Sequence, residues 1–185
     1  MAATTLDPKT ALIVIDLQKG IVGLPTAHPA SEVVERAARL AAAFRRRRLP
    51  VVLVNVDGGA PGRTEQTRLG AFPDGWTELV AELNPQPQDH RVTKRTWGAF
   101  TNTGLLDILK REGVTQVVIA GIATSAGVES TARQAHEFGF NVALATDAMT
   151  DMRPEAHENS VERVFPRLGE TATTDAILAL LEARA

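Results

Sequence analysis

Three segments of the sequence carry groups suited to chemistry. Asp16 follows an apolar run at residues 11–15, and Lys94 ends a weaker strand pattern at residues 91–94. The third segment, residues 121–132, connects an apolar run to a helical pattern through small residues. The free N–H groups of a helix N-terminus suit an anion or an oxyanion, and a carboxylate at the carboxyl end of a strand points into the ligand crevice of a parallel sheet.

Each of these features also has a plainer interpretation. An isolated Asp16 is more often a cap or turn residue, and Lys94 alone is more often a solvated surface residue. The third segment also reads as a short connection in which Ser125 caps the following helix. Trp97 and Phe100, close to Lys94, would be ordinary core residues. Spacing alone does not separate these alternatives.

Apolar runs alternate with helical patterns along the whole chain. Continuous apolar runs predict buried strands at residues 11–15, 50–56, 117–121 and 141–145. Weaker patterns predict two more strands at residues 91–94 and 168–171. Continuous apolar runs are typical of strands buried on both faces. The alternation predicts an α/β fold with three α/β/α layers around a central, mainly parallel six-stranded sheet. The length predicts one domain over residues 1–185.

The helical patterns and their end signals predict where the connecting helices lie. Ser31 is the expected N-cap of a helix over residues 33–44, and Asn102 is the expected cap of a helix that ends at Gly113. The remaining predicted helices cover 76–83, 128–138, 154–164 and 174–182. The charge run at residues 45–48 then falls at the end of the first long helix, where we expect a solvated face.

Composition excludes several classes of function. The formal net charge is −2, which argues against nonspecific binding to nucleic acid or to an anionic membrane. The chain contains no cysteine, so disulfides, thiolate metal sites and a cysteine nucleophile are all excluded. No apolar run reaches the ~18 residues of a membrane span, so a cytoplasmic protein is expected. Composition says nothing about small-molecule ligands.

Taken together, the three segments resemble the isochorismatase-like hydrolase family, also called the cysteine hydrolase superfamily. The most specific parts are residues 15–18, 94–100 and 121–132, and residues 146–148 also fit. The family's usual triad is Asp, Lys and Cys, and the resemblance places Asp16 and Lys94 at the first two positions. It also implies a cis peptide bond between Ile122 and Ala123.

The sequence departs from the family at the nucleophile. The Cys position is occupied by Gly127, so the thiolate attack of the amide hydrolases in this family has no counterpart here. Nicotinamidases also share an Asp-x-His-x-His metal motif after the second strand. The corresponding residues 57–61 contain no histidine, so the resemblance predicts no metal site. It also implies a small-molecule substrate and no cofactor.

Isochorismatases proper resemble this chain in having Gly at the Cys position, and they hydrolyse a vinyl ether. That reaction begins with protonation of the enol carbon and needs a general acid. Asp16 would be the acid, with its pKa raised by burial, while Lys94 orients it and binds an anionic or carbonyl group. Gly127 would leave room for the substrate. The expected substrate contacts are Gln18, Trp97, Phe100, Ile122, Ala123 and Ser125.

Two functional hypotheses follow. The first is an isochorismatase-type hydrolase acting on a vinyl ether or a related C–O or C–N bond. The second is a catalytically inactive family member that binds a small molecule or acts as a scaffold. Catalysis by Ser125 or Ser130 is a weaker alternative, because a serine nucleophile needs a base such as histidine within hydrogen-bond reach. His157 falls in a predicted helix away from the strand ends.

Two further expectations concern binding surfaces. Family members are commonly oligomeric, so the resemblance implies a homo-oligomer, and the helices after Asn102 and after Gly127 are candidate interfaces. Carboxylate-binding groups are expected after the second strand, where the sequence offers Arg63, Gln66 and Arg68.

Overall fold

The fold is built on one six-stranded sheet. The computed structural model describes residues 3–65 and 72–183. All strand pairings within the sheet are parallel, in the order β3-β2-β1-β4-β5-β6. The strands are β1 (Thr10–Ile15), β2 (Val51–Val56), β3 (His90–Lys94), β4 (Gln116–Ile122), β5 (Asn141–Thr150) and β6 (Glu170–Ala172). The predicted α/β fold with a mainly parallel six-stranded sheet is confirmed.

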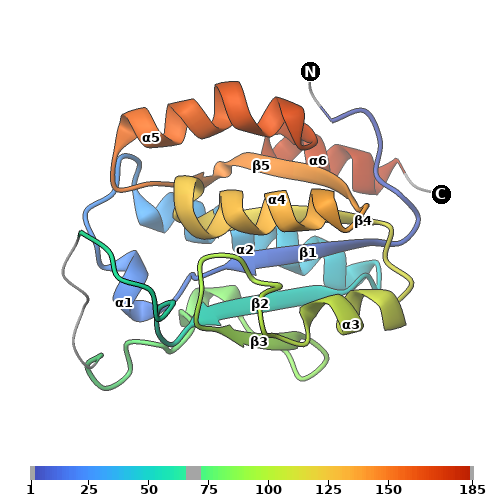
Figure 1. Ribbon diagram of the computed structural model, residues 1–185. Helices are drawn as coiled ribbons and strands as arrows, with labels where there is room; N and C mark the ends of the chain where they lie inside the picture. Colours follow the sequence, from blue (N-terminus) through green and yellow to red (C-terminus); the bar gives the residue numbers. More distant parts are fainter. Residues whose placement is uncertain (1–2, 66–71, 184–185) are drawn as a thin grey trace.

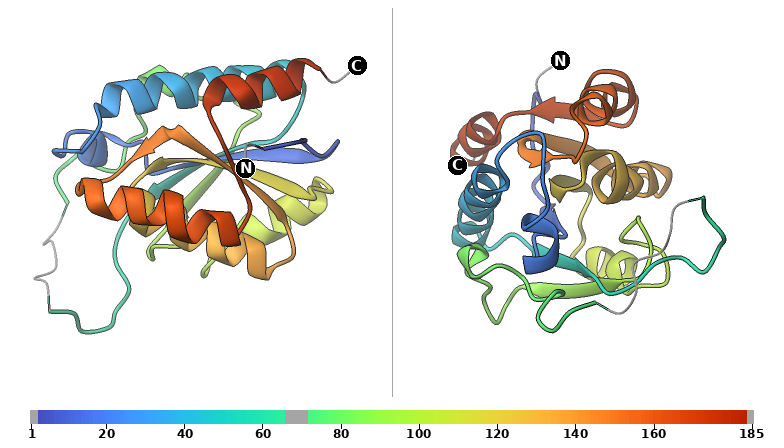
Figure 2. Two further views of the ribbon diagram at one scale, coloured as in Figure 1. Left: turned by 90° about the horizontal axis from the view of Figure 1, so that it is seen from above. Right: turned by 90° about the vertical axis from the view of Figure 1, so that its left-hand side faces the viewer.

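Helices cover both faces of this sheet (Figures 1 and 2). One face carries α2 (Ala30–Arg46) and α6 (Thr174–Glu182), while the short helix α1 (Lys19–Val22) lies at the carboxyl end of β1. The other face carries α3 (Leu105–Arg111), α4 (Glu129–Glu137) and α5 (Pro154–Asn159). Short 3-10 turns lie at Ala81–Leu83 and Phe165–Arg167, and π-helical turns at Thr124–Val128 and Ser160–Val164. No helix in the described ranges is both long and apolar enough to cross a membrane.

Alternating residues of the central strands supply two separate hydrophobic cores. Leu12 and Val14 of β1 pack in the core that contains Phe44 of α2. Ile13 and Ile15 point the other way, into the core that contains Leu109 of α3. Because successive strand side chains point to opposite faces, a strand covered on both sides must be apolar at every position. This is the physical reason for the continuous apolar runs in the sequence.

Two predicted helix caps are wrong. Helix α2 begins at Ala30 with Pro29 before it, so Ser31 lies inside the first turn and no side chain caps the helix. Helix α3 begins at Leu105 after Gly104, and Asn102 instead adopts a left-handed conformation with φ 54°. Asn adopts this conformation more readily than most residues, so Asn102 forms part of a turn and does not cap a helix.

The predicted helix over residues 76–83 is also wrong. Only the 3-10 turn Ala81–Leu83 is helical. The residues before it form an irregular segment that contacts the start of α1. The backbone N–H groups of Lys19 and Gly20 donate to the carbonyls of Glu78 and Trp76. A Cβ added at Gly20 would overlap the Trp76 ring, so the ring packs directly on the backbone there. These contacts replace the hydrogen bonds that a helix would make.

Arg45 is not part of a solvated face, contrary to the sequence expectation. Its Nε and Nη2 atoms donate to the two carboxylate oxygens of Asp89 at 3.0 and 2.7 Å, and both Nη atoms donate to the Leu83 carbonyl. The side chains are 11% and 1% exposed. This bidentate pair fixes the end of α2 to the segment that leads into β3.

Replacement of Arg45 by Leu should therefore destabilise the fold by about 3 kcal/mol, because the Asp89 carboxylate would stay buried without a partner. The matched control is Arg46→Leu, at an exposed position one residue along the same helix, with an expected change within about 0.5 kcal/mol. Urea unfolding followed by circular dichroism measures both. Equal effects of the two substitutions would contradict the role given to the Arg45–Asp89 pair.

Candidate active site

The sheet order reverses between β1 and β4, and the candidate site lies at the carboxyl ends of these strands. From β1 the chain adds β2 and β3 on one side, while β4, β5 and β6 follow on the other. The connections leaving β1 and β4 therefore lead to opposite faces of the sheet, and ligands of open α/β sheets bind at such a point. Asp16 comes directly after β1, and the turn Thr124–Val128 follows β4.

Asp16 and Lys94 form a buried pair at this edge. Lys94 Nζ lies 2.7 Å from Asp16 Oδ2, and the side chains are only 2% and 7% exposed. The ammonium also donates to the Thr96 carbonyl at 3.1 Å. Lys94 ends β3, which is separated from β1 by β2, so the sheet rather than the local chain brings the two groups together. The sequence named both residues, and the fold places them in contact.

Burial raises the pKa of Asp16 from 3.8 to about 6, although the charge of Lys94 and its hydrogen bond both lower it. Burial dominates because a carboxylate loses its hydration in the interior. The folded protein therefore binds a proton that an unfolded chain releases between pH 3.8 and about 6. The contribution of this group to stability is greatest at low pH and decreases as pH rises through that window.

The two oxygens of Asp16 have different surroundings. Oδ2 accepts the hydrogen bond from Lys94, whereas Oδ1 is buried and has no hydrogen-bond partner among the described residues. A buried polar atom without a partner is unusual and often marks a functional position. On a protonated carboxyl, Oδ1 is the oxygen available to carry the proton, because Oδ2 faces an ammonium.

Gly127 borders the Asp16 carboxyl. A Cβ added at Gly127 would lie 3.2 Å from Asp16 Oδ2, 2.9 Å from Ile15 Cγ2 and 3.6 Å from the Trp97 carbonyl oxygen. Any side chain at this position would therefore push against Ile15 and crowd the acid. The glycine keeps that space free beside the carboxyl group.

Polar contacts hold the turn that contains Gly127. The peptide bond between Ile122 and Ala123 is cis, as the resemblance implies. Ser125 donates through both its backbone N–H and its hydroxyl to Asp151 Oδ2 at 2.8 Å. The Thr124 hydroxyl lies 2.8 Å from His157 Nδ1. These bonds attach the turn to the end of β5 and to α5.

The sequence did not single out Asp151, and it placed His157 away from the site. Strand β5 continues to Thr150, so Asp147 lies within this strand. Asp147 accepts hydrogen bonds from the N–H and the hydroxyl of Thr174 at the start of α6. Asp151 therefore holds the post-strand position. The expectation that His157 lies away from the strand ends is wrong. Burial lowers its pKa, and the ring of His28 beside it adds to this effect.

Comparison with known proteins identifies the family once this geometry is known. A sequence model of the Isochorismatase domain matches residues 10–176. The chain belongs to the isochorismatase family. The structure of an isochorismatase family protein from Burkholderia thailandensis is similar, with a TM-score of 0.94 and 40% identity over 97% of this chain and 98% of that one.

Two curated isochorismatase family proteins are also similar to this chain. YwoC of Bacillus subtilis, an uncharacterized family protein, is 42% identical over 92% of this chain and 93% of its own length. YecD of Escherichia coli O157:H7, also named as uncharacterized, is 42% identical over 93% of this chain and 96% of its own length. The chain thus spans almost the full length of these isochorismatase relatives.

Within this isochorismatase fold, the predicted substrate contacts lie in different environments. The Trp97 side chain is 69% exposed, whereas Phe100 is buried and packs against the rings of Phe138 and Phe140. The amide of Gln18 is fully buried; its nitrogen donates to the carbonyls of two residues, and its oxygen accepts from the Val56 N–H. Contact of these residues with a substrate stays a prediction.

Several charged and polar residues follow β2. Asp57 pairs with Arg95 at 3.3 Å on the surface, and Arg63 is exposed. Gln66 and Arg68, the other candidates for carboxylate binding, lie outside the described residues. Across residues 3–65 and 72–183, no three His, Asp or Glu side chains are grouped so that they could hold a metal ion.

Replacement of Lys94 by Met should raise the pKa of Asp16 above about 6, because the substitution removes the charge and the hydrogen bond that lower it. Carbon-13 NMR titration of the side-chain carboxyl measures the midpoint. The control Lys110→Met changes an exposed lysine of α3 and should leave the midpoint where it is. A midpoint that fell or stayed constant in Lys94→Met would show that the ammonium does not govern this carboxyl group.

Proposed function

We propose that this isochorismatase-family protein hydrolyses a small-molecule vinyl ether, or a similarly acid-labile ether, by general-acid catalysis from Asp16. The observation that carries the proposal is the buried Asp16 carboxyl, which has a pKa of about 6, an unpartnered Oδ1 and a glycine beside it. A carboxyl that keeps its proton near neutral pH can donate it in the rate-limiting step.

The reaction needs no covalent intermediate on the protein. Asp16 gives its proton to the terminal enol carbon, a C–H bond forms, and the ether oxygen shares its lone pair to give an oxocarbenium ion. Water adds to the cationic carbon and releases a proton to the Asp16 carboxylate. The resulting hemiketal breaks its bond to the alcohol oxygen, which takes up the hydroxyl proton. The products are one ketone and one alcohol, and Asp16 is protonated again.

Lys94 has a supporting role in this scheme. When Asp16 gives up its proton, the ammonium at 2.7 Å stabilises the carboxylate that forms and keeps it oriented. An ammonium has three donors, and Lys94 uses two of them on Asp16 and the Thr96 carbonyl. The third is available for an anionic or carbonyl group of the substrate.

The surroundings of the serines favour this scheme over serine catalysis. The Ser125 hydroxyl donates to the Asp151 carboxylate, while the nearby His157 ring contacts the Thr124 hydroxyl instead. No hydrogen bond between a serine hydroxyl and a histidine ring is found in the described parts of the chain. The sequence contains no cysteine, so a mechanism without a side-chain nucleophile fits the groups that are present.

Substitution of Asp16 by Asn should lower kcat/KM for a vinyl ether substrate at least ~100-fold, because the amide cannot donate the required proton. The probe is a panel of chorismate-like vinyl ethers, amides and imides. Asp107→Asn, at an exposed position on α3, is the control and should keep activity within about twofold. Full activity of Asp16→Asn would rule out the mechanism. If the wild-type protein and Asp16→Asn bind a ligand equally well and neither turns it over, the result would support a non-catalytic binding protein instead.

The pH dependence of kcat/KM gives a second test. The active form has a protonated Asp16, so kcat/KM should be constant at low pH and fall about tenfold per pH unit above about 6. Initial rates over a series of buffers at constant ionic strength measure this profile. A rate that rises through the same range would mean that the carboxylate, rather than the acid, is the active form.

A further inference from the structure

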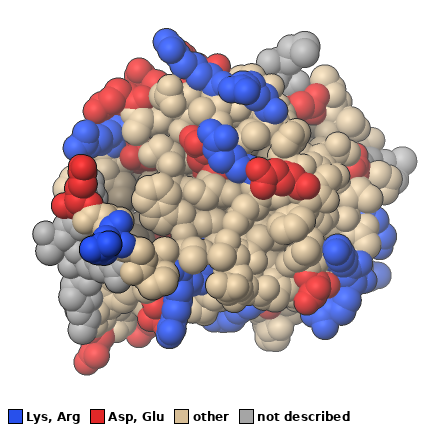
Figure 3. All heavy atoms as spheres, in the orientation of Figure 1, with Lys and Arg blue, Asp and Glu red and all other residues tan. Residues whose placement is uncertain are grey.

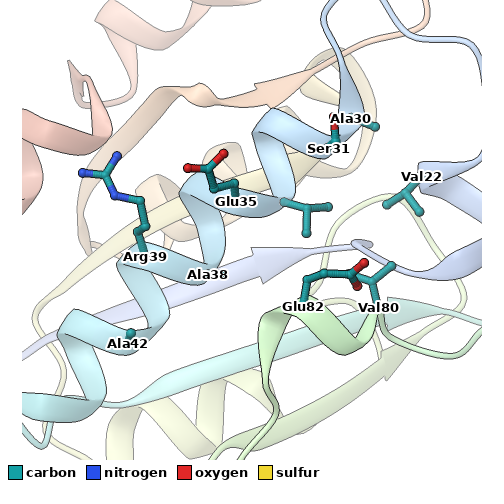
Figure 4. Close-up of a pocket in the computed structure, with 10 residues that line it drawn as sticks. Val22, Ala30, Ser31, Glu35, Ala38, Arg39, Ala42, Val80 and Glu82 are labelled. Atoms are coloured by element: carbon teal, nitrogen blue, oxygen red, sulfur yellow. The ribbon is translucent and has the colours of Figure 1, made fainter.

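The cavity along α2 is separate from the candidate active site (Figure 4). Its volume is about 600 Å³, and its lining does not include Asp16, Lys94 or Gly127. Helix α4, on the other face of the sheet, hydrogen-bonds instead with both the turn containing Gly127 and the loop 95–103 that follows Lys94. One residue in the first turn of α4, Thr131, makes both of these contacts.

The Thr131 hydroxyl is buried and joins these two segments through one oxygen atom. Oγ1 donates to the Gly127 carbonyl at 2.7 Å and accepts from the Ala99 N–H at 3.1 Å. The first bond is common for a threonine in a helix, whereas the second reaches a residue 32 positions earlier in the chain. The Ala99 N–H has no other acceptor among the described residues, so loss of the hydroxyl would leave a buried backbone donor unpaired.

The loop that follows Lys94 holds the lysine ammonium in place. Lys94 Nζ donates to the Thr96 carbonyl at 3.1 Å, while it lies 2.7 Å from Asp16 Oδ2. The Thr96 hydroxyl donates in turn to the Gly98 carbonyl at 2.9 Å, which fixes the start of the loop. The carbonyl that directs the ammonium toward Asp16 therefore depends on the conformation of this loop.

Helix α4 supports the same loop through a second residue. One turn after Thr131, Gln134 Oε1 accepts from the Phe100 N–H at 3.1 Å, and its nitrogen donates to the Thr101 hydroxyl at 2.6 Å. A Cβ added at Gly98 would overlap the Gln134 amide, so the loop backbone lies directly on the helix. None of these hydrogen bonds involves a charged group, in keeping with the few charged side chains in the middle of this face (Figure 3).

We propose that Thr131 is a positioning residue of the acid site, which fixes the loop after Lys94 against the turn containing Gly127 so that the ammonium stays on Asp16 Oδ2. This role rests on the proposed acid mechanism, in which the ammonium stabilises the carboxylate that forms. The contacts form a closed ring. They run from Asp16 to Lys94, along the loop to Ala99, through Thr131 to Gly127, and from there to the space beside Asp16. Thr131 closes this ring.

Thr131→Val, which keeps the shape of the side chain and removes the hydroxyl, tests this role. The midpoint of the Asp16 carboxyl in a carbon-13 NMR titration should rise by at least ~0.3 pH units, because a displaced ammonium lowers the pKa less. With a vinyl ether substrate, kcat should fall at least ~10-fold, since the developing carboxylate loses part of its stabilisation. Thr131→Ser retains the hydroxyl and should restore both quantities to near their wild-type values.

Thr174→Val is the matched control, because it also removes a buried, hydrogen-bonded hydroxyl, in this case one that donates to Asp147 at 2.9 Å. Thr174 lies at the start of α6, on the other face of the sheet, so this variant should lose stability without a change in the Asp16 midpoint or in kcat. Circular dichroism verifies that each variant is folded. If Thr131→Val does not fold, Gln134→Met decides, because it removes the second attachment of the loop and should change both quantities in the same direction.

An unchanged midpoint and an unchanged kcat in the deciding variant would overturn the positioning role. Changes of equal size in Thr131→Ser would assign the effect to side-chain packing and would overturn it as well. The midpoint is measured without substrate, so the test of Thr131 holds even if Asp16→Asn keeps full activity, the result that rules out the proposed mechanism. An inactive Asp16→Asn together with an unaffected Thr131→Val would refute the role of Thr131 alone.

Discussion

The contact between Lys94 and Asp16 sets the electrostatics of the site. An ammonium 2.7 Å from a carboxyl favours the carboxylate, yet burial outweighs it and raises the pKa of Asp16 to about 6. The site therefore keeps a proton up to about pH 6 beside a positive charge. In the proposed reaction, this balance would let the acid donate its proton and would stabilise the carboxylate that forms. Without Lys94 the buried carboxyl would hold its proton more tightly and would donate it less readily.

The parallel sheet brings the groups of the site together. β1 and β4 lie side by side where the strand order reverses, so Asp16 and the turn containing Gly127 meet at one edge. Lys94 reaches the same edge from β3, two strands away from β1. The turn is held from behind by Asp151, which accepts both polar hydrogens of Ser125. The absence of a side chain at Gly127 avoids crowding of the carboxyl group, and in the proposed reaction water rather than a thiolate attacks.

Continuous apolar runs allowed the sheet to be predicted from sequence, because strands buried on both faces have no polar positions to obscure the pattern. The caps at Ser31 and Asn102 were not predictable, since the same residue types serve helix starts and left-handed turns. Asp16 and Lys94 were identified through the family resemblance. His157 was missed because its contact with Thr124 depends on how α5 packs on the turn after β4, and no local pattern encodes that packing.

Infrared difference spectroscopy between the wild-type protein and Asp16→Asn measures the protonation of this carboxyl group directly. The carbonyl stretch of a protonated carboxyl should be present at about pH 4.5, be lost with a midpoint of about 6, and be replaced by carboxylate bands at about pH 8. A midpoint near 3.8, the ordinary value for an aspartic acid, would contradict it. Asp16 would then already be ionised at about pH 6, where the proposed mechanism needs the protonated acid.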